Sequence, residues 1–471
     1  MIKFGTGGWR AVIGDDFTKE NVYKVSQGIY EYMKLVGQTD KPVVIGYDRR
    51  FLSDTAARWI AEVLCANGVT VHFAYRSVPT PLVMFTVKDK GFYFGIEVTA
   101  SHNPPAYNGI KLIVNEGRDA PLECTQKLEE IIEALDTVNS MPFESAVKKG
   151  LVVYKKTPFN DFIDSILGML DVNVIRENGP RILFDPMHGS STYPLMAIMY
   201  TARCTLDLMN SNKDAYFGGN MPAPGERELT DLVERVVSEG YDLGIALDGD
   251  GDRLGIIDKN GEYIDANKIL VMLYYYLHEY RSWRGAVVRN LATTHMLDAV
   301  AASFGEECYE VPVGFKYISS KLDETDALLG GESSGGLTVR GHIFGKDSIY
   351  AASLFVEMFC ATGKSPTEFY RELAEKYGSF EMVEDNLVFD PSDKDRINKL
   401  IMVEKRLPSF EGKTVTRVNY EDGCKVYFDD NSFVICRFSG TEPLLRIFAE
   451  SDNAADAQRL IDEMKRFIDV K

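Results

Sequence analysis

Short apolar runs followed by amphipathic segments recur along most of the chain. The apolar run 43–48 ends in a polar residue, and apolar positions then recur at helical spacing between 57 and 65. The Asn67-Gly68 pair ends this predicted helix, and another apolar run follows at once. The runs 181–186 and 242–248 repeat the rhythm. Because a strand–helix–strand order favours parallel pairing, this pattern predicts α/β domains with mostly parallel sheets.

The last part of the chain follows a different pattern. Residues 415–440 alternate between apolar and polar with period two, and Asp422-Gly423 and Asp430-Asn431 are turn signals, which predicts antiparallel hairpins. A final amphipathic helix is predicted over 454–468. Boundaries near 157, after Asp258 and within 376–386 follow from these changes of pattern. They divide the chain into four predicted domains: 1–156, 157–258, 259–376 and 377–471.

Composition narrows the possible functions. The chain has 471 residues, of which 45% are hydrophobic and 26% charged, the balance of a globular protein with a sizeable core. Its formal net charge of −18 argues against nucleic acid as a partner, because binding that backbone needs a basic face. A small phosphorylated substrate remains possible, since a local basic pocket can lie in an acidic protein.

The beginning of the sequence and the cysteines bear on location. The first residues lack an apolar stretch of signal-peptide length, and the longest apolar run, 269–277, is far shorter than the roughly 20 residues of a membrane span. The seven cysteines are scattered and none forms a CxxC pair, so reduced, mostly buried thiols are expected. We therefore expect a cytoplasmic protein with no membrane partner.

Ser101 is a candidate nucleophile. It lies in the segment 97–112, between an apolar stretch and a loop rich in Asn, Pro and Gly. A serine in such a loop is usually a turn residue. His102 and Lys111 change this interpretation, because both can carry protons and Lys111 adds positive charge that would favour an attached phosphate.

Three aspartates indicate a cation site. Asp248, Asp250 and Asp252 alternate with glycines directly after an apolar run. Carboxylates this close repel one another unless a cation holds them, and their hard oxygens suit Mg²⁺, Mn²⁺ or Ca²⁺. An acidic surface turn is the alternative. An EF-hand loop is excluded, since its sixth position would be Arg253 and its twelfth Lys259.

Three further segments carry weaker signals. In 330–336, Glu332 and Ser334 could bind a polyhydroxy ligand, although the composition also fits a flexible linker. In 437–447, arginines, hydroxyls and a glycine could cradle an anion, although a plain strand–turn–helix junction is the alternative. The residues of this predicted cradle are Arg437, Ser439, Gly440, Thr441 and Arg446. The glycine-rich segment 4–10 ends in Arg10, which could contact phosphate.

Together these segments resemble the α-D-phosphohexomutase superfamily. Five motifs stand in that superfamily's order: FGTGGWR, TASHNPPAYNGIK, DGDGDR, GESSGG and RFSGTEP. They extend from Phe4 to Ile447, over nearly the whole chain. The resemblance implies three related mixed α/β domains and a smaller C-terminal α+β lid domain around a central cleft.

The resemblance also implies roles for single residues. Ser101 would be the phosphorylated serine, and the three aspartates would bind Mg²⁺ together with its oxygen. The residues expected around the transferring phosphoryl group are Arg10, His102 and Lys111, whereas Arg253 is expected beside the metal loop as a substrate-binding residue. The residues expected to contact the substrate are Gly314, Glu332, Ser334, His342, Lys346 and the predicted cradle. Gly336 departs from members that carry a proton-accepting histidine there, so Lys316 or His342 is expected to take that role.

The implied reaction interconverts hexose 1-phosphate and hexose 6-phosphate through a hexose 1,6-bisphosphate intermediate. Glucose is favoured, because the segment 313–318 resembles the corresponding loop of phosphoglucomutases, and glucose 1,6-bisphosphate is the expected activator. A phosphomannomutase or a dual glucose/mannose mutase is the first alternative. A metal-dependent phosphatase with a serine nucleophile and a non-catalytic sugar-phosphate-binding module are more remote. A monomer or a homodimer is expected.

Overall fold

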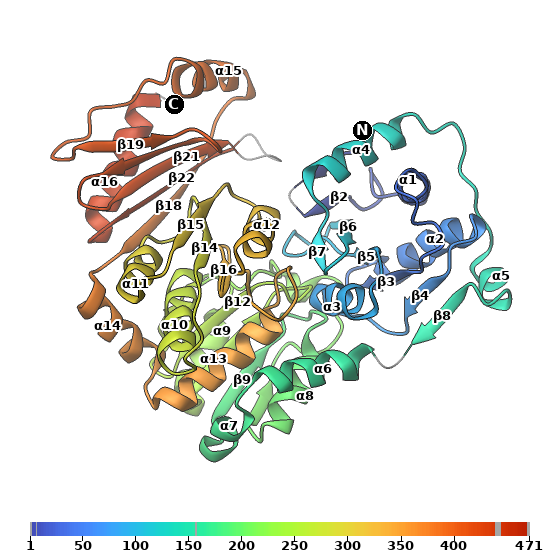
Figure 1. Cartoon of the computed structure of the whole chain (residues 1–471), viewed down its shortest axis with the longest axis horizontal. Coiled ribbons are helices and arrows are strands. Elements are labelled where there is room, and N and C mark those ends of the chain that lie inside the picture. Colours follow the sequence, from blue (N-terminus) through green and yellow to red (C-terminus); the bar gives the residue numbers. More distant parts are fainter. Residues whose placement is uncertain (1, 6, 156–157, 439–443, 469–471) are drawn as a thin grey trace. The chain divides into compact units, whose positions relative to one another are not determined.

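Figure 1 shows the computed structural model, which describes residues 2–5, 7–155, 158–438 and 444–468. The chain divides into two compact units. The first unit comprises 1–269 and 334–367, and the second comprises 270–333 and 368–471. Each unit is therefore built from two stretches that lie far apart in the sequence.

The N-terminal sheet belongs to the first unit. Its strands are β1 (Phe4–Gly5), β2 (Gly8–Val12), β3 (Val43–Tyr47), β4 (Val71–Ala74), β5 (Phe94–Val98), β6 (Tyr107–Val114), β7 (Arg118–Asp119) and β8 (Val152–Lys155). Their order is β1-β2-β6-β5-β3-β4-β8, with β7 paired to β6. β3, β4, β5 and β8 are parallel, as the pattern predicts, whereas β6 runs antiparallel to β5 and makes the sheet mixed. The loop that joins β5 to β6 carries Ser101.

Helices cover both faces of this sheet. They are α1 (Lys19–Leu35), α2 (Ser53–Ala66), α3 (Thr80–Lys90), α4 (Leu122–Glu133) and α5 (Phe143–Lys148). Val43 and Ile45 point into a core shared with α1, α2, α4 and α5. Val44 points to the opposite face, toward α3, because successive side chains of a strand alternate between faces.

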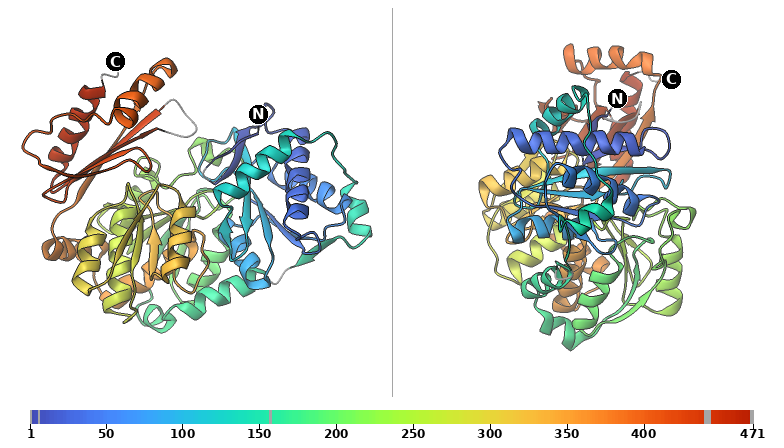
Figure 2. Two further views of the ribbon diagram at one scale, coloured as in Figure 1. Left: turned by 45° about the horizontal axis from the view of Figure 1, so that its top comes forward. Right: turned by 90° about the vertical axis from the view of Figure 1, so that its right-hand side faces the viewer.

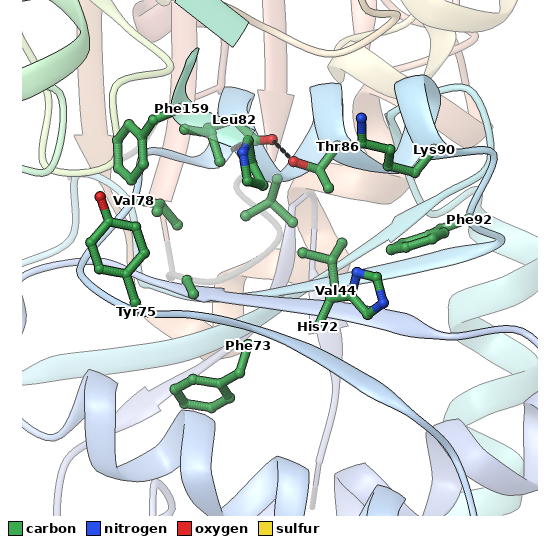
Figure 3. Close-up of a pocket in the computed structure, with 13 residues that line it drawn as sticks. Val44, His72, Phe73, Tyr75, Val78, Leu82, Thr86, Lys90, Phe92 and Phe159 are labelled. Carbon is green, nitrogen blue, oxygen red and sulfur yellow. Dashed lines mark hydrogen bonds between the residues drawn. The ribbon is translucent and has the colours of Figure 1, made fainter. Parts of the chain in front are cut away.

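A cavity of about 450 Å³ lies between this second face and α3 (Figure 3). Its lining is mostly apolar and aromatic, and Phe73, Leu82, Phe92 and Phe159 contribute to it. None of its described lining residues belongs to the candidate chemistry, so the site has to be sought elsewhere.

The second sheet of the first unit carries the aspartates. Its strands are β9 (Arg181–Asp185), β10 (Thr205–Leu208), β11 (Leu243–Leu247), β12 (Leu254–Asp258) and β13 (Tyr263–Ile264), in the order β10-β9-β11-β12-β13. The helices of this part are α6 (Pro158–Met169), α7 (Val172–Asn178), α8 (Thr192–Thr201), the short η1 (Phe217–Gly219), α9 (Thr230–Glu239) and α13 (Ser348–Thr362), and β17 (Leu337–Val339) precedes α13. β10, β9 and β11 are parallel, whereas β11 and β12 form an antiparallel hairpin. The three aspartates lie in the turn of that hairpin.

A third sheet has the strand order β15-β14-β16-β17, and its first three strands belong to the second unit. Its elements are α10 (Ala266–Glu279), β14 (Val287–Asn290), α11 (Met296–Phe304), β15 (Cys308–Val311), α12 (Phe315–Thr325), β16 (Leu329–Gly331) and, later in the chain, α14 (Pro366–Tyr377). β14 lies between β15 and β16 and is parallel to both. This arrangement follows from the strand–helix–strand order.

The C-terminal sheet is antiparallel. Its strands are β18 (Glu381–Val388), β19 (Val415–Asn419), β20 (Cys424–Phe428), β21 (Phe433–Phe438) and β22 (Leu444–Ser451), in the order β18-β22-β21-β20-β19. The short turns η2 (Pro391–Asp393), α15 (Lys394–Asn398) and η3 (Lys399–Val403) follow β18. α16 (Ala454–Ile468) packs along the sheet (Figure 2). Both predicted hairpins and the predicted final helix are confirmed.

The predicted fold class is therefore confirmed: three mixed α/β parts are followed by a smaller antiparallel sheet with helices. The four domain limits and the central cleft stay predictions. The seven cysteines are free thiols. Among the helices that the structure describes, none combines the length and the apolar character that a membrane span requires.

Candidate active site

Ser101 lies in a strained and buried loop. Its backbone φ is +53°, in the left-handed region that non-glycine residues seldom adopt. The Ser101 backbone N–H donates to Thr99 Oγ1 at 2.8 Å. The Ser101 hydroxyl donates to Asp248 Oδ2 at 3.2 Å and lies 3.3 Å from His102 Nδ1. The tertiary fold thus brings the candidate nucleophile to the first of the three aspartates.

Arg50 holds the serine loop, and the sequence analysis gave it no role. Its buried guanidinium donates to four backbone carbonyls, those of Ser101, Asn103, Pro104 and Tyr107. Asp48 in turn accepts from the backbone N–H of Arg50 at 2.9 Å and from Thr99 Oγ1 at 2.7 Å. The run GYDRR at 46–50 is the only sequence signal, and it does not show which loop these residues hold.

Asp248, Asp250 and Asp252 converge as predicted. All three are buried, and each offers one carboxylate oxygen within 4.8 Å of the others. Gly251 has a φ of +74°, which allows the chain to turn tightly between the last two. Asp248 Oδ1 accepts the backbone N–H groups of Asp252 at 2.8 Å and Arg253 at 3.0 Å. The Asp248 Oδ2 atom is therefore directed toward Ser101.

Two lysines and a threonine bond the other aspartates. Lys111 Nζ lies 2.6 Å from Asp250 Oδ2 and 2.7 Å from Asp252 Oδ2. Lys346 Nζ lies 3.0 Å from Asp252 Oδ2. Thr80, which the sequence analysis missed because it is far from every motif, donates to Asp250 Oδ2 at 2.6 Å. Residues from three distant segments thus meet at the triad.

The charges of the triad set the protonation of Lys111. Burial alone would lower the pKa of this lysine, but the carboxylates of Asp250 and Asp252 raise it above its ordinary value. Lys111 therefore stays an ammonium group. As a proton acceptor it would need a lowered pKa, so the geometry favours an electrostatic role for it.

The residues of the triad fit a magnesium ion. Burial and the neighbouring charges of Asp250 and Asp252 raise the pKa of Asp248 well above its ordinary value, so the positive charge nearby does not balance this carboxyl. Asp250 Oδ1 and Asp252 Oδ1 are buried and have no hydrogen-bond partner among the described residues. Unpaired buried oxygens of this kind are unfavourable unless a cation binds them, and hard oxygen ligands suit Mg²⁺.

Positive charge surrounds the serine. Arg10 donates to Asn103 Oδ1 at 2.5 Å, and burial together with the charge of Arg253 lowers the pKa of Arg10. Burial and the charges of Arg253 and Arg10 also lower the pKa of His102 far below its ordinary value, so that its imidazole is neutral. An anionic phosphoryl group would therefore be favoured at this position.

The side chain of Lys346 explains why position 336 is a glycine. A Cβ atom at this glycine would lie 2.1 Å from Lys346 Cδ. The absence of a larger side chain at 336 thus leaves the space through which Lys346 reaches Asp252. A histidine at 336 and this position of Lys346 exclude each other.

His342 is held by a carboxylate and two aromatic rings. Its ring is buried, its Nε2 atom lies 2.6 Å from Asp347 Oδ2, and it packs against Phe162 and Tyr350. These contacts explain how the ring is held, and the binding or proton-accepting role of His342 stays a prediction. Lys316 stays the other candidate proton acceptor.

The remaining candidate residues lie mostly on the second unit. Gly314 has a φ of +129° and precedes the first turn of α12, in which Lys316 lies half-buried. Glu332 is buried and accepts from Asn290 Nδ2 at 3.2 Å. Ser334 is exposed and begins the later stretch of the first unit, so the GESSGG motif is divided between the units.

The predicted anion cradle is partly described. Arg437 and Arg446 are cross-strand neighbours on β21 and β22, and both are half-buried. Arg437 Nη2 lies 3.2 Å from Asp422 Oδ2. Ser439, Gly440 and Thr441 lie outside the described residues, so their part in the cradle stays a prediction.

Comparisons with known proteins agree with this geometry. Four family descriptions match successive parts of the chain: phosphoglucomutase/phosphomannomutase α/β/α domain I at 1–139, domain II at 160–261, domain III at 265–377, and the C-terminal domain at 393–467. The chain belongs to the phosphoglucomutase/phosphomannomutase family. Within the α-D-phosphohexomutase superfamily it is a mutase, an intramolecular phosphotransferase.

Individual relatives cover nearly the whole chain. A phosphoglucomutase/phosphomannomutase of Thermococcus kodakarensis is 28% identical over 98% of this chain and 96% of its own length. A phosphoglucosamine/phosphogalactosamine mutase of Sulfurisphaera tokodaii is 27% identical over 99% of both chains. The crystal structure of a phosphomannomutase homologue from Thermus thermophilus superposes with a TM-score of 0.85 at 26% identity, covering 99% of both chains.

Proposed function

We propose that this mutase interconverts hexose 1-phosphates and hexose 6-phosphates through a phosphorylated Ser101 and a hexose 1,6-bisphosphate intermediate. The observation that supports the proposal is the 3.2 Å contact between Ser101 Oγ and Asp248 Oδ2. A serine hydroxyl held beside a buried carboxylate triad has the surroundings that a metal-assisted phosphoryl group requires.

The proposal assigns Mg²⁺ to Asp248, Asp250, Asp252 and the oxygen of Ser101. Bound there, Mg²⁺ would neutralise charge on the phosphoryl oxygens. Arg10 and Arg253 would face the phosphoryl oxygens, because both lie close enough to depress the pKa of His102. Lys111 and Lys346 would fix the carboxylates in place through their ion pairs.

The transfer itself breaks one P–O bond and forms another. The substrate hydroxyl oxygen attacks phosphorus, the bond from phosphorus to Ser101 Oγ breaks, and the hydroxyl proton passes to a base. Lys316 is the proposed acceptor of that proton, since His342 is bonded to Asp347. In the second half of the cycle, the other phosphate of the bisphosphate returns to Ser101.

The proposed substrate contacts come mostly from residues of the second unit, together with Ser334 of the first unit. Glu332 and Ser334 would contact the sugar hydroxyls, Gly314 would allow close approach of the backbone, and Arg437 and Arg446 would bind the phosphate that is not reacting. Both substrate isomers can then use one phosphate site, because the two phosphates of the bisphosphate exchange places. Activity would depend on glucose 1,6-bisphosphate as activator.

Glucose phosphate is the proposed substrate, from the resemblance of the segment 313–318 to phosphoglucomutases. Glucosamine phosphate is the second candidate, because the Sulfurisphaera relative acts on amino sugars according to its name. Preferences of this kind depend on one or two hydrogen bonds of about 1 kcal/mol each. Coupled assays with glucose, glucosamine and mannose 1-phosphates, each primed with its 1,6-bisphosphate, would rank the three sugars by kcat/KM.

Labelling of Ser101 tests the mechanism. Incubation with glucose 1,6-bisphosphate labelled with ³²P should place label on the peptide that contains Ser101. Ser101→Ala should remove the label and lower turnover by at least about 10³-fold. Ser140→Ala, in an exposed loop, is the matched control and should behave like the wild type. Isomerisation without labelling of Ser101 would contradict the proposal, and release of inorganic phosphate without isomerisation would indicate a phosphatase.

A further inference from the structure

The candidate sugar-binding and phosphate-binding residues of the second unit lie on different sheets. Glu332 follows β16 of the parallel sheet, whereas Arg437 and Arg446 lie in the antiparallel C-terminal sheet. A hexose phosphate presents its hydroxyls and its phosphate at a nearly fixed separation. The two groups of residues can therefore bind one substrate together only in one relative position of the two sheets.

An apolar seam joins the two sheets. Leu291 and Ala292, which follow β14, share one buried cluster with Phe433, Ile435 and Phe448 of the C-terminal sheet. Such contacts are favourable but not directional, so they alone do not determine a unique register between the sheets.

Buried ion pairs between the two sheets supply the directional contacts that the apolar seam lacks. Lys425 of β20 is fully buried, and its ammonium lies 2.7 Å from Glu310 Oε2 of β15 and 2.9 Å from His295 Nε2. Glu310 is also bonded by Arg289 of β14 at 2.7 Å and by Arg417 of β19 at 3.0 Å. One carboxylate thus accepts hydrogen bonds from cations of both sheets.

The loop 290–295 connects this cluster to the predicted sugar site. Asn290 Nδ2 donates to Glu332 Oε2 at 3.2 Å, and Thr293 Oγ1 accepts the backbone N–H of Ser333 at 3.2 Å. At the other end of the loop, the backbone N–H of His295 donates to Glu450 Oε1 of β22 at 2.8 Å. The loop therefore contacts the sugar-binding segment and the C-terminal sheet together.

Asp422 makes a second connection. Its Oδ2 atom accepts the backbone N–H of Val313 at 3.0 Å and lies 3.2 Å from Arg437 Nη2. Val313 immediately precedes Gly314 in the loop that leads to Lys316. The carboxylate of Asp422 thus bridges the loop of the predicted sugar side and the arginine of the predicted phosphate side.

We propose that Asp422 and the Lys425–Glu310 pair are positioning residues, which hold the phosphate-binding arginine Arg437 at a fixed place relative to the sugar-binding residue Glu332. The proposal rests on the proposed function, because it takes the substrate roles of Glu332 and Arg437 from there. It predicts that these charges affect substrate affinity although they contact no substrate.

Asp422 gives the sharper test. Asp422→Ala removes both bonds of the bridge and should raise the KM for the hexose 1-phosphate about tenfold, with kcat within about twofold of the wild type. Asp422→Asn keeps an acceptor for the Val313 N–H but loses the charge that faces Arg437, so KM should rise only about threefold. Lys399→Met, which removes an exposed lysine that follows β18, should leave KM unchanged. Unchanged KM in a folded Asp422→Ala variant would overturn the bridge.

Lys425→Met tests the buried pair. Amide hydrogen exchange should become faster in β20, in β21 and in the loop 290–295 together, and KM should rise by about the same factor as in Asp422→Ala. A lower thermal midpoint with wild-type KM and unchanged exchange in the loop would show that the Lys425–Glu310 pair only stabilises the fold, which would overturn its positioning role. If Lys425→Met does not fold, Glu310→Gln gives the same comparison with a smaller change.

Failure of this inference can be told apart from failure of the proposed function. In the first case, the wild type labels Ser101 and turns over, while the variants keep the wild-type KM. In the second case, the wild type itself neither labels Ser101 nor isomerises a hexose phosphate.

Discussion

Lys111 and Lys425 are both buried lysines bonded to carboxylates, but their surroundings move their pKa values in opposite directions. Lys111 bonds two carboxylates, those of Asp250 and Asp252, and its pKa is raised. Lys425 bonds one carboxylate, which it shares with two arginines. Burial and the charge of Arg289 lower the pKa of Lys425 to about 7.

The balance of charge distinguishes the candidate cation site at the aspartate triad from the ion-pair cluster around Glu310. At the triad, two lysines bond the aspartates, and two carboxylate oxygens still have no partner among the described residues. At Glu310, three cations and the hydroxyl of Tyr427 satisfy a single carboxylate. The first cluster has room for another cation, whereas the second is already rich in positive charge.

The largest effect is expected at the triad. Asp248→Asn keeps the shape of the side chain but removes the charge beside Ser101, so mutase activity should fall by at least about 10³-fold. Mg²⁺ at about 100 times its Kd should stabilise the wild type by about 2.7 kcal/mol and the variant much less, as a thermal shift would record. Asp164→Asn, at an exposed position of α6, is the control. Wild-type activity of Asp248→Asn would refute the role of the triad.

Effects of intermediate size are expected on the free energy of unfolding, and they should differ between Lys111 and Lys425. Lys111→Met leaves Asp250 without its buried cation and Asp252 with Lys346 alone, and should cost about 3 kcal/mol or more in the absence of divalent ions. Lys425→Met leaves Glu310 bonded to Arg289 and Arg417 and should cost only about 1 kcal/mol. Urea unfolding with and without Mg²⁺ measures both. Mg²⁺ should recover much of the loss in Lys111→Met and none in Lys425→Met, and equal losses would contradict the comparison.

The smallest effect concerns pH. The pKa of Lys425 is about 7 in the folded chain, against an ordinary value of 10.5. Between these values the unfolded chain binds more protons, so this group makes stability rise with pH. The groups that act on Lys425 are Glu310, His295, Arg289 and Glu450. The stability of the wild type relative to Lys425→Met should therefore increase from pH 7 to pH 9, and a constant difference would refute the lowered pKa.

Much of the fold could be predicted from local pattern. The described residues of the period-two segment 415–440, with its two turn signals, form β19, β20 and β21, and the final helix begins and ends at the predicted residues. Both predictions depend on contacts between residues close in sequence. The sequence did not indicate that β6 runs antiparallel to β5 and β12 to β11. The hydrophobic pattern does not show whether two successive strands are joined by a hairpin or by a crossover.

The candidate site was predictable where a motif is contiguous. The spacing of Asp248, Asp250 and Asp252 indicated convergence, and the structure confirms it. Thr80 and Arg50 were missed, because each meets the site only through the folding of a distant segment. The environment of His342 could not be foreseen either, since its bond to Asp347 depends on how the loop between β17 and α13 folds.

The alternation of elements, the acidic turn and a serine with cationic neighbours can all be recognised in the sequence, because these properties belong to short stretches of chain. Which ammonium groups face which carboxylates depends on the folding of distant segments, and so does which lysine is fully charged and which is close to losing its proton. The physical reason is that the energy of a buried charge depends on every charge and dipole within a few ångströms, and most of these come from residues far away along the chain.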